Sequence, residues 1–391
     1  MISPQPSPFR FAIAGMIAMA VAMGIGRFVY TPILPGMMDE LGMSASGAGF
    51  IASANYVGYL AGAVLASGGW GHGRERLVMI AALLASGLLA VSMGLTISVP
   101  AFVVIRFLAG VASAFVMVFA STIVFGHLAA AGRTDLQAFH FGGVGLGISV
   151  SSVMTGALVL AAAPWWESWL WAGALSVLGF LVVAMMIDRG PLRTGDGGRE
   201  PPLPRTGAFV RIIIAYGLFG FGYVVTATFL IAIVRQGEAG RLYESAVWLA
   251  TGLAGIPSVL VWSKVAKRLG LTVTFAIGCI VEAVGVLASV ALGGYAGPML
   301  GGILLGATFI AVTALGLQAA ARLVPKSPRR ALAMMTASFG IGQIVGPIFA
   351  GYAADITGTF FVPSLGAAAM LALSAVIAWD AGRRSREMLP Q

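Results

Sequence analysis

Apolar residues fill twelve runs of about membrane-spanning length, separated by short segments that hold charges, prolines or glycines. A helix that crosses the apolar core of a bilayer needs about 20 such residues. The pattern predicts transmembrane helices at 10–38, 47–69, 77–97, 100–126, 137–161, 165–187, 209–235, 245–264, 271–292, 297–318, 331–353 and 360–380. We therefore expect an all-α membrane protein with twelve transmembrane helices.

The first apolar run begins like a signal peptide, because Arg10 precedes it. The run continues from Phe11 past Val29 and ends in Pro32 and Pro35, with no small-residue cleavage site. The apolar region of a removable signal is shorter, at roughly 7 to 15 residues. We therefore interpret this run as a retained transmembrane helix.

The composition of the whole chain excludes a water-soluble fold. Of 391 residues, 59% are hydrophobic and 9% are charged, and the mean hydropathy is +0.96. A typical soluble domain has about 25% charged residues, and a soluble protein would have to expose this apolar excess as patches that drive association. The single cysteine, Cys279, lies in an apolar run, which excludes a disulfide framework, a paired-thiol redox motif and a cysteine-based metal cluster.

The formal net charge is +9, but the basic residues lie in short loops between the apolar runs. If both termini are cytoplasmic, nineteen Lys and Arg side chains fall on the cytoplasmic side, and only Arg235 and Arg241 fall outside. Cytoplasmic loops of membrane proteins carry such an excess of positive charge. The charges thus predict cytoplasmic termini, and we do not expect nucleic-acid binding.

A segment rich in proline, glycine and arginine interrupts the series of apolar runs at 188–208. Such a composition cannot bury a core and predicts a linker. We expect it to be cytoplasmic and to separate a six-helix bundle at 1–187 from a second six-helix bundle at 209–391.

Short glycine patterns repeat between the two predicted bundles. Residues 24–28 match 220–224, and Gly110 matches Gly306, both at an offset of 196, while 143–146 match 340–343 at an offset of 197. Matches in one register indicate duplication, which predicts two pseudo-symmetric bundles. Parallel repeats of six helices are a transporter architecture in which the substrate site lies between the repeats.

Several of these segments resemble motifs of the major facilitator superfamily. Residues 104–110, with Arg106 followed by Gly110, resemble its motif B, and 263–270 resemble a second copy of its motif A. The first copy, at 71–76, lacks the aspartate on which the family's charge-relay gate depends. The stretches GIGRFVYTPILP and FGGVGLGIS resemble the bacterial YbfB-type branch. The resemblance implies the major facilitator fold, alternating access and a bacterial inner-membrane location, but no particular substrate.

Motifs for enzyme chemistry are weak. His72, His127 and His140 are widely spaced and form no HExxH motif, and no GxSxG motif occurs. The glycine run at 143–147 lies within an apolar run, where small residues allow close helix packing. We expect no catalytic residue, metal or cofactor, and an intramembrane enzyme stays a minor alternative.

Three ionisable residues lie well inside predicted spans: Arg27, Arg106 and Glu282. Such residues are costly in a membrane and are usually retained for function. In the resembled fold helices 1 and 4 border the central cavity, so Arg27 and Arg106 are expected to form an electropositive substrate site. The alternative is that helix carbonyls and water satisfy both arginines. Glu282 is expected to carry coupling protons, or otherwise to hydrogen-bond a neighbouring helix.

Aromatic and polar side chains complete the predicted site. Tyr223 takes the repeat position equivalent to Arg27, and His140 is a second residue that can titrate, although a capping role is as compatible with its position. Packing is the alternative for every aromatic in the set. The remaining predicted substrate-binding residues are Tyr30, Asn55, Tyr59, Tyr216, Thr226, Trp248 and Gln343.

We therefore predict a secondary transporter for a small organic anion, such as an aromatic or amphipathic carboxylate, with protons as a candidate coupling ion. The expected partners are the small-molecule substrate and the lipid bilayer, and the chain is expected to act as a monomer. Efflux of hydrophobic compounds is the alternative within the same class. A non-transporting scaffold is a third hypothesis, although no soluble signalling domain is evident in the sequence.

Overall fold

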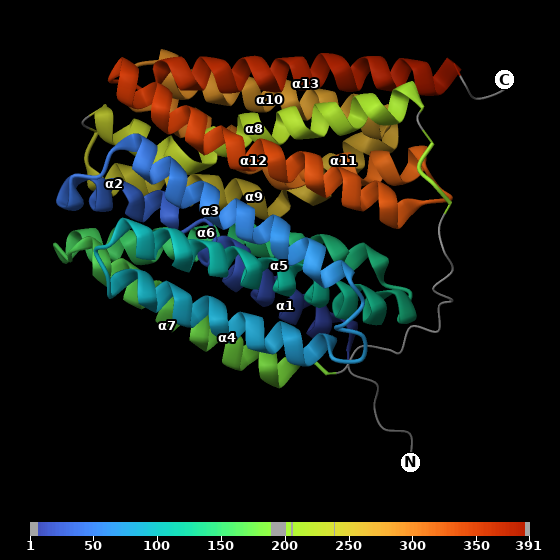
Figure 1. Cartoon of the computed structure of the whole chain (residues 1–391), viewed down its shortest axis with the longest axis horizontal. Coiled ribbons are helices and arrows are strands. Elements are labelled where there is room, and N and C mark those ends of the chain that lie inside the picture. The colour runs from blue at the N-terminus through green and yellow to red at the C-terminus, as the bar shows by residue number, and fades with distance from the viewer. Residues whose placement is uncertain (1–6, 189–200, 205, 238, 388–391) are drawn as a thin grey trace.

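The computed structural model describes residues 7–188, 201–204, 206–237 and 239–387, with side chains placed up to Arg383. Within these residues, twelve helical spans are long and apolar enough to cross a membrane. They lie side by side in one bundle (Figure 1). The all-α transmembrane fold predicted from the apolar runs is confirmed.

The first span is built from three pieces, α1 (Pro8–Met19), a π-helical turn (Ala20–Ile25) and α2 (Tyr30–Leu41). The fifth begins with a short 3-10 turn (Thr134–Leu136). The other helices are α3 (Ala45–Ser67), α4 (Glu75–Gly94), α5 (Val99–Ala130), α6 (Gln137–Leu160), α7 (Trp165–Met186), α8 (Gly207–Gln236), α9 (Arg241–Leu269), α10 (Leu271–Ala291), α11 (Ala296–Leu323), α12 (Pro328–Thr357) and α13 (Phe361–Glu387).

The helices agree with the predicted spans within a few residues but often extend beyond them. The largest extension is that of α13, which continues past the predicted end at 380 to Glu387. Helices α9 and α11 also extend, through last turns that carry Lys267, Arg268 and Arg322. The predicted spans end before these charged residues. Lysine and arginine favour helix formation and interact well with the negative end of the helix dipole, so the helices continue past the apolar segment.

Helices α1 to α7 form one side of the bundle, and α8 to α13 form the other (Figure 1). We call these the first and second halves. The start of α1 and the end of α13 lie at one end of the bundle, which we call the terminal end. Helix α2 meets α3 at the opposite end, which we call the distal end. The predicted linker at 188–208 falls largely outside the described residues, so the domain boundaries stay a prediction.

The two halves repeat one close helix contact at equivalent positions. A Cβ added to Gly110 would lie 2.0 Å from the carbonyl oxygen of Asn55, and one added to Gly306 would lie 2.0 Å from that of Thr251. Both residues of the second contact follow their counterparts in the first by 196 positions, which is the repeat offset. Both glycines allow the backbones of two helices to touch. The repeat register found in the sequence therefore corresponds to a repeated packing contact.

Three helix pairs make the main contacts between the halves: α3 with α12, α6 with α9, and α2 with α8. Smaller contacts join α2 with α9 and α6 with α11. The Thr31 hydroxyl of α2 donates to the carbonyl oxygen of Ala227 on α8 at 2.5 Å. These two residues are also 196 positions apart. Equivalent positions of the two repeats thus face each other, as expected for helices that flank a pseudo-twofold axis.

Candidate substrate site

The first transmembrane span is irregular in its middle. Hydrogen bonds from Gly26 to Val21 (2.7 Å) and from Phe28 to Met23 (3.1 Å) join residues five apart, and a turn follows before α2 begins. Gly24 lies in this turn and packs closely on α6, where an added Cβ would lie 2.5 Å from the Cα of Gly147. Such π-type turns are frequent at functional sites. Here the turn carries Arg27.

Arg106 of α5 supports this turn. Its Nη1 donates to the carbonyl oxygen of Gly26 at 2.8 Å, and its Nη2 donates to that of Arg27 at 2.9 Å. The carbonyl of Arg106 in turn accepts from Asn55 Nδ2 at 3.0 Å. Arg106 is buried, and its guanidinium faces the rings of Tyr30 and Trp169. These contacts satisfy carbonyls that the broken helix leaves unpaired, which favours the structural alternative for Arg106.

Arg27 has a different environment. Its side chain is 4% exposed, and the guanidinium lies 4.4 Å from the ring centroid of Tyr56 and 4.6 Å from that of Tyr59. Within the described residues, Nε and Nη2 have no hydrogen-bond partner, and Arg27 is in no salt bridge. Cation–π contacts stabilise the charge by up to about 2 kcal/mol when desolvated, but they do not satisfy the N–H donors. Two donors of a permanent cation are therefore free to bind an anion.

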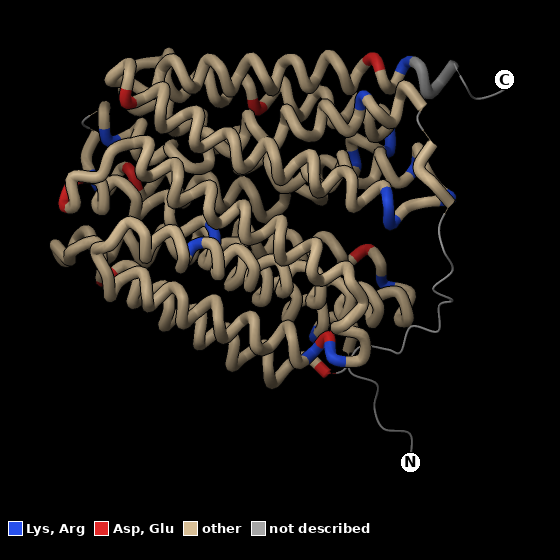
Figure 2. The backbone as a smooth tube through the Cα atoms, in the orientation of Figure 1, with Lys and Arg blue, Asp and Glu red and all other residues tan. Residues whose placement is uncertain are grey.

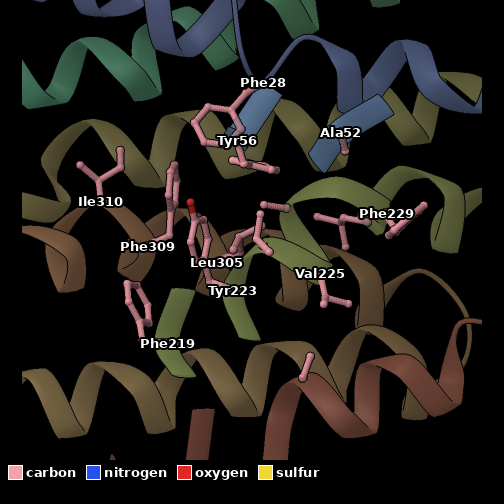
Figure 3. Packing of buried hydrophobic residues seen from close by; sticks show 14 of the residues in the cluster. Phe28, Ala52, Tyr56, Phe219, Tyr223, Val225, Phe229, Leu305, Phe309 and Ile310 are labelled. Carbon is pink, nitrogen blue, oxygen red and sulfur yellow. The ribbon is translucent and has the colours of Figure 1, made fainter. Parts of the chain in front are cut away.

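An aromatic cluster from the second half faces this arginine across the bundle. Tyr223 stacks on Phe219, Phe309 and Phe339 at centroid distances of 5.3 to 6.0 Å. Phe28, next to Arg27 in the chain, meets Phe309 edge to face at 5.4 Å. Figure 3 shows Phe28 and Tyr56 pointing toward Phe309 and Tyr223. The turn with Arg27 and the aromatic cluster thus meet where the two halves join.

The other predicted polar residues vary in what they contact. The amide Nε2 of Gln343 donates to the hydroxyl of Tyr223, which ties α12 to α8. The hydroxyl of Tyr30 donates to the carbonyl of Ala48 at 3.0 Å, and that of Tyr216 to Thr313 at 3.1 Å. Tyr30 and Tyr216 thus donate hydrogen bonds to backbone carbonyls. Gln343 and Tyr223 lie where the two halves meet.

A family model matches residues 19–379 of this sequence, and its description is "Uncharacterised MFS-type transporter YbfB". The chain belongs to this family. The match spans both six-helix halves and includes Arg27 and the aromatic cluster. No curated protein matches the sequence.

Solved structures of transporters share the fold of this MFS transporter. The crystal structure of the nucleoside transporter NupG is similar, with a TM-score of 0.72 and 15% identity, over 96% of this chain and 99% of that one. The inward-facing, unoccupied structure of a bacterial homolog of the human lysosomal transporter Spinster gives a TM-score of 0.70 at 12% identity, over 97% and 98% of the two chains. At these identities the similarity shows the major facilitator fold alone.

Glu282 of the transporter is fully buried, at 0% exposure, on α10. Its side chain lies within the second half, beside Thr308 of α11. Neither carboxyl oxygen makes a hydrogen bond of ordinary geometry among the described residues. Thr308 instead donates to the carbonyl of Leu304 at 2.6 Å.

His140 lies inside the first half, away from Glu282. Its Nε2 is 3.0 Å from the hydroxyl oxygen of Ser121, and its ring packs against Phe125 and Phe141. Its Nδ1 faces Gly15 of α1, where an added Cβ would approach to 2.6 Å. The residue is held between α1, α5 and α6, so its predicted proton-transfer role gains no support from its contacts.

Two predicted residues of the second half are buried with polar atoms that lack partners. Within the described part of the chain, the Thr226 hydroxyl and the indole N–H of Trp248 make no hydrogen bond. Buried polar groups normally have partners. Their roles in binding stay predictions.

Sequence reasoning missed Tyr56, Phe309 and Phe339. Tyr56 precedes Tyr59 by three residues, so both rings lie on one face of α3. That spacing was available in the sequence. Phe309 and Phe339 offered no comparable signal, because phenylalanines are common throughout these apolar helices.

Proposed function

We propose that this MFS transporter moves a small organic anion, an aromatic or amphipathic carboxylate, by alternating access, and that Arg27 binds its negative group. We propose proton coupling through Glu282 and function as a monomer. The observation that carries the anion assignment is the pair of unpartnered guanidinium nitrogens of Arg27 among aromatic rings.

The physical argument rests on the cost of an unpaired buried charge. A guanidinium keeps its charge at any physiological pH, and desolvating it without a hydrogen-bonded counter-ion is strongly unfavourable. Arg106 is close, but its Nη1 and Nη2 already donate hydrogen bonds to carbonyls of the turn. A substrate carboxylate would supply the missing acceptors in bidentate geometry. The rings of Tyr59 and Tyr223 would then contact the apolar part of such a substrate.

The test uses matched pairs of compounds on the purified transporter. We expect aromatic carboxylates to raise the unfolding temperature, because a ligand of the native state stabilises it by mass action. The corresponding primary amides keep the shape but lack the charge, and they should give no shift. Equal shifts with acids and amides would contradict the assignment.

The aromatic cluster also favours the alternative of hydrophobic-compound efflux. Tyr223, Phe219, Phe309 and Phe339 present stacked rings that suit any flat apolar ligand. Under that alternative, neutral compounds bind as well as acids, and the charge of Arg27 contributes little. The same acid and amide pairs therefore separate the two functions.

We propose that the terminal end is cytoplasmic in the bacterial inner membrane. Lys and Arg gather at this end of the bundle (Figure 2), as the excess of positive charge in cytoplasmic loops requires. A reporter enzyme that is active only in the periplasm should therefore give no signal when fused after Leu389. A strong signal from that fusion would reverse the orientation.

A further inference from the structure

The contacts between the halves gather from the middle of the bundle to its distal end. Along α3 and α12, an added Cβ on Gly49 would lie 2.2 Å from the Pro347 carbonyl oxygen, and one on Gly351 would lie 2.2 Å from that of Ala45. The helices of the halves converge at this end and diverge toward the terminal end in Figure 1. The distal side is therefore the closed side in this conformation.

Asp355, at the distal end of α12, reaches the first half. Its Oδ1 accepts from the backbone N–H of Ala45 at 2.9 Å, and its Oδ2 accepts from that of Ser46 at 3.0 Å. Both donors belong to the first turn of α3, whose N–H groups have no partner within the helix. Ser44 caps a different donor, Gly47 N, at 3.1 Å. A carboxylate from one half therefore completes a helix N-terminus of the other.

Arg235, at the distal end of α8, makes a second charged contact between the halves. Its Nη1 lies 2.5 Å from Asp39 Oδ2 of the first half. Its Nε and Nη2 donate to the two carboxyl oxygens of Glu244 at 2.8 and 2.6 Å, within its own half. If the halves separate at this end, Arg235 loses Asp39 but keeps Glu244, so its charge stays neutralised in both arrangements.

We propose that Asp355 and the Asp39–Arg235 pair are two latches that hold the distal side closed and set how often it opens. The proposal rests on transport by alternating access, but it does not depend on which substrate is carried. Asp355 is exposed and the Asp39 side chain is 51% exposed, so solvent weakens both latches. Each should bias the open and closed populations by about three- to tenfold. A modest bias suits a gate that must open in every cycle.

The experiment measures distances between spin labels in the ligand-free transporter. Labels on Ser98→Cys and Gly293→Cys report on the distal side, and labels on Ala131→Cys and Lys326→Cys report on the terminal side, in a Cys279→Ala background. Asp355→Ala and Asp39→Asn should each raise the distal-open fraction about three- to tenfold, with a matching shift to shorter distances at the terminal side. The two substitutions together should multiply these effects, because each breaks a separate contact.

Glu40→Gln is the control, because it removes a negative charge at the same end but takes part in neither latch. It should leave the distances unchanged. Asp355→Asn keeps the side-chain shape and one acceptor oxygen, so it should give an intermediate shift if Asp355→Ala folds poorly. Wild-type distances in the Asp355 and Asp39 variants would overturn the proposal. Because no substrate is present, a failure of anion binding leaves this result unaffected.

Discussion

Replacing Arg27 by alanine is expected to weaken binding of an aromatic carboxylate about 100-fold. A hydrogen bond to a charged group contributes about 1.5 to 3 kcal/mol, and tenfold in affinity is about 1.4 kcal/mol. Arg27 is the cation whose Nε and Nη2 are buried and unpartnered among the described residues. Titration calorimetry or ligand-induced shifts of the unfolding temperature would measure the loss, with the matched amide as the uncharged reference.

Arg27→Lys should recover part of this affinity and remain about tenfold weaker than the wild type. Lysine restores the charge but cannot present the planar fork that binds a carboxylate through two bonds. Unchanged affinity in a folded alanine variant would eliminate Arg27 as the anion ligand. Equal losses for the acid and the amide would instead assign Arg27 to packing.

Arg106 is the matched comparison for Arg27, because both are buried arginines of the first half. Arg106→Ala leaves the carbonyls of Gly26 and Arg27 without their donors and opens a cavity between α5 and the turn. It should lower the free energy of unfolding by about 2 to 4 kcal/mol. Arg27→Ala should cost less, since two of its donor nitrogens form no hydrogen bond. A reversed order of stabilities would contradict these separate roles.

Replacing Glu282 by glutamine is expected to abolish accumulation driven by a pH gradient. A buried carboxyl group changes its charge only by exchanging a proton, and glutamine cannot do so. Exchange of internal for external substrate needs no net proton movement, so it should persist in the variant. Proteoliposomes with an imposed pH gradient would measure the first activity, and counterflow at equal pH would measure the second.

Glu40→Gln at the exposed distal end serves as the control and should keep both activities. Accumulation by Glu282→Gln at the wild-type level would show that another group carries the proton. Loss of both accumulation and exchange would assign Glu282 to structure, through its position beside Thr308.

The fold was predictable because the bilayer demands long apolar helices with all backbone groups paired internally. The role of Arg106 was not, because its acceptors exist only where the first span departs from a regular helix. The departure lies where Gly24 packs against Gly147 of another helix, a contact that the sequence alone does not give. The sequence places both arginines inside the membrane, but it does not tell which of them donates hydrogen bonds to backbone carbonyls.

The buried orientation of the Glu282 side chain could have been predicted from the pattern of small and polar residues along α10. Small and polar residues recur along one stripe of α10, with Gly278, Cys279, Gly285 and Ser289 buried together with Glu282. A stripe at three- and four-residue spacing marks the face that packs on other helices.

Counterflow in proteoliposomes tests the central claim most directly. Vesicles that contain the purified transporter are loaded with an unlabelled aromatic carboxylate and diluted into a trace of the labelled compound. Wild-type protein should accumulate the label transiently, the Arg27→Ala variant should not, and unlabelled acid outside should compete where its amide does not. Equal counterflow by the wild type and the folded Arg27→Ala variant, or equal competition by acid and amide, would contradict transport of an organic anion bound at Arg27.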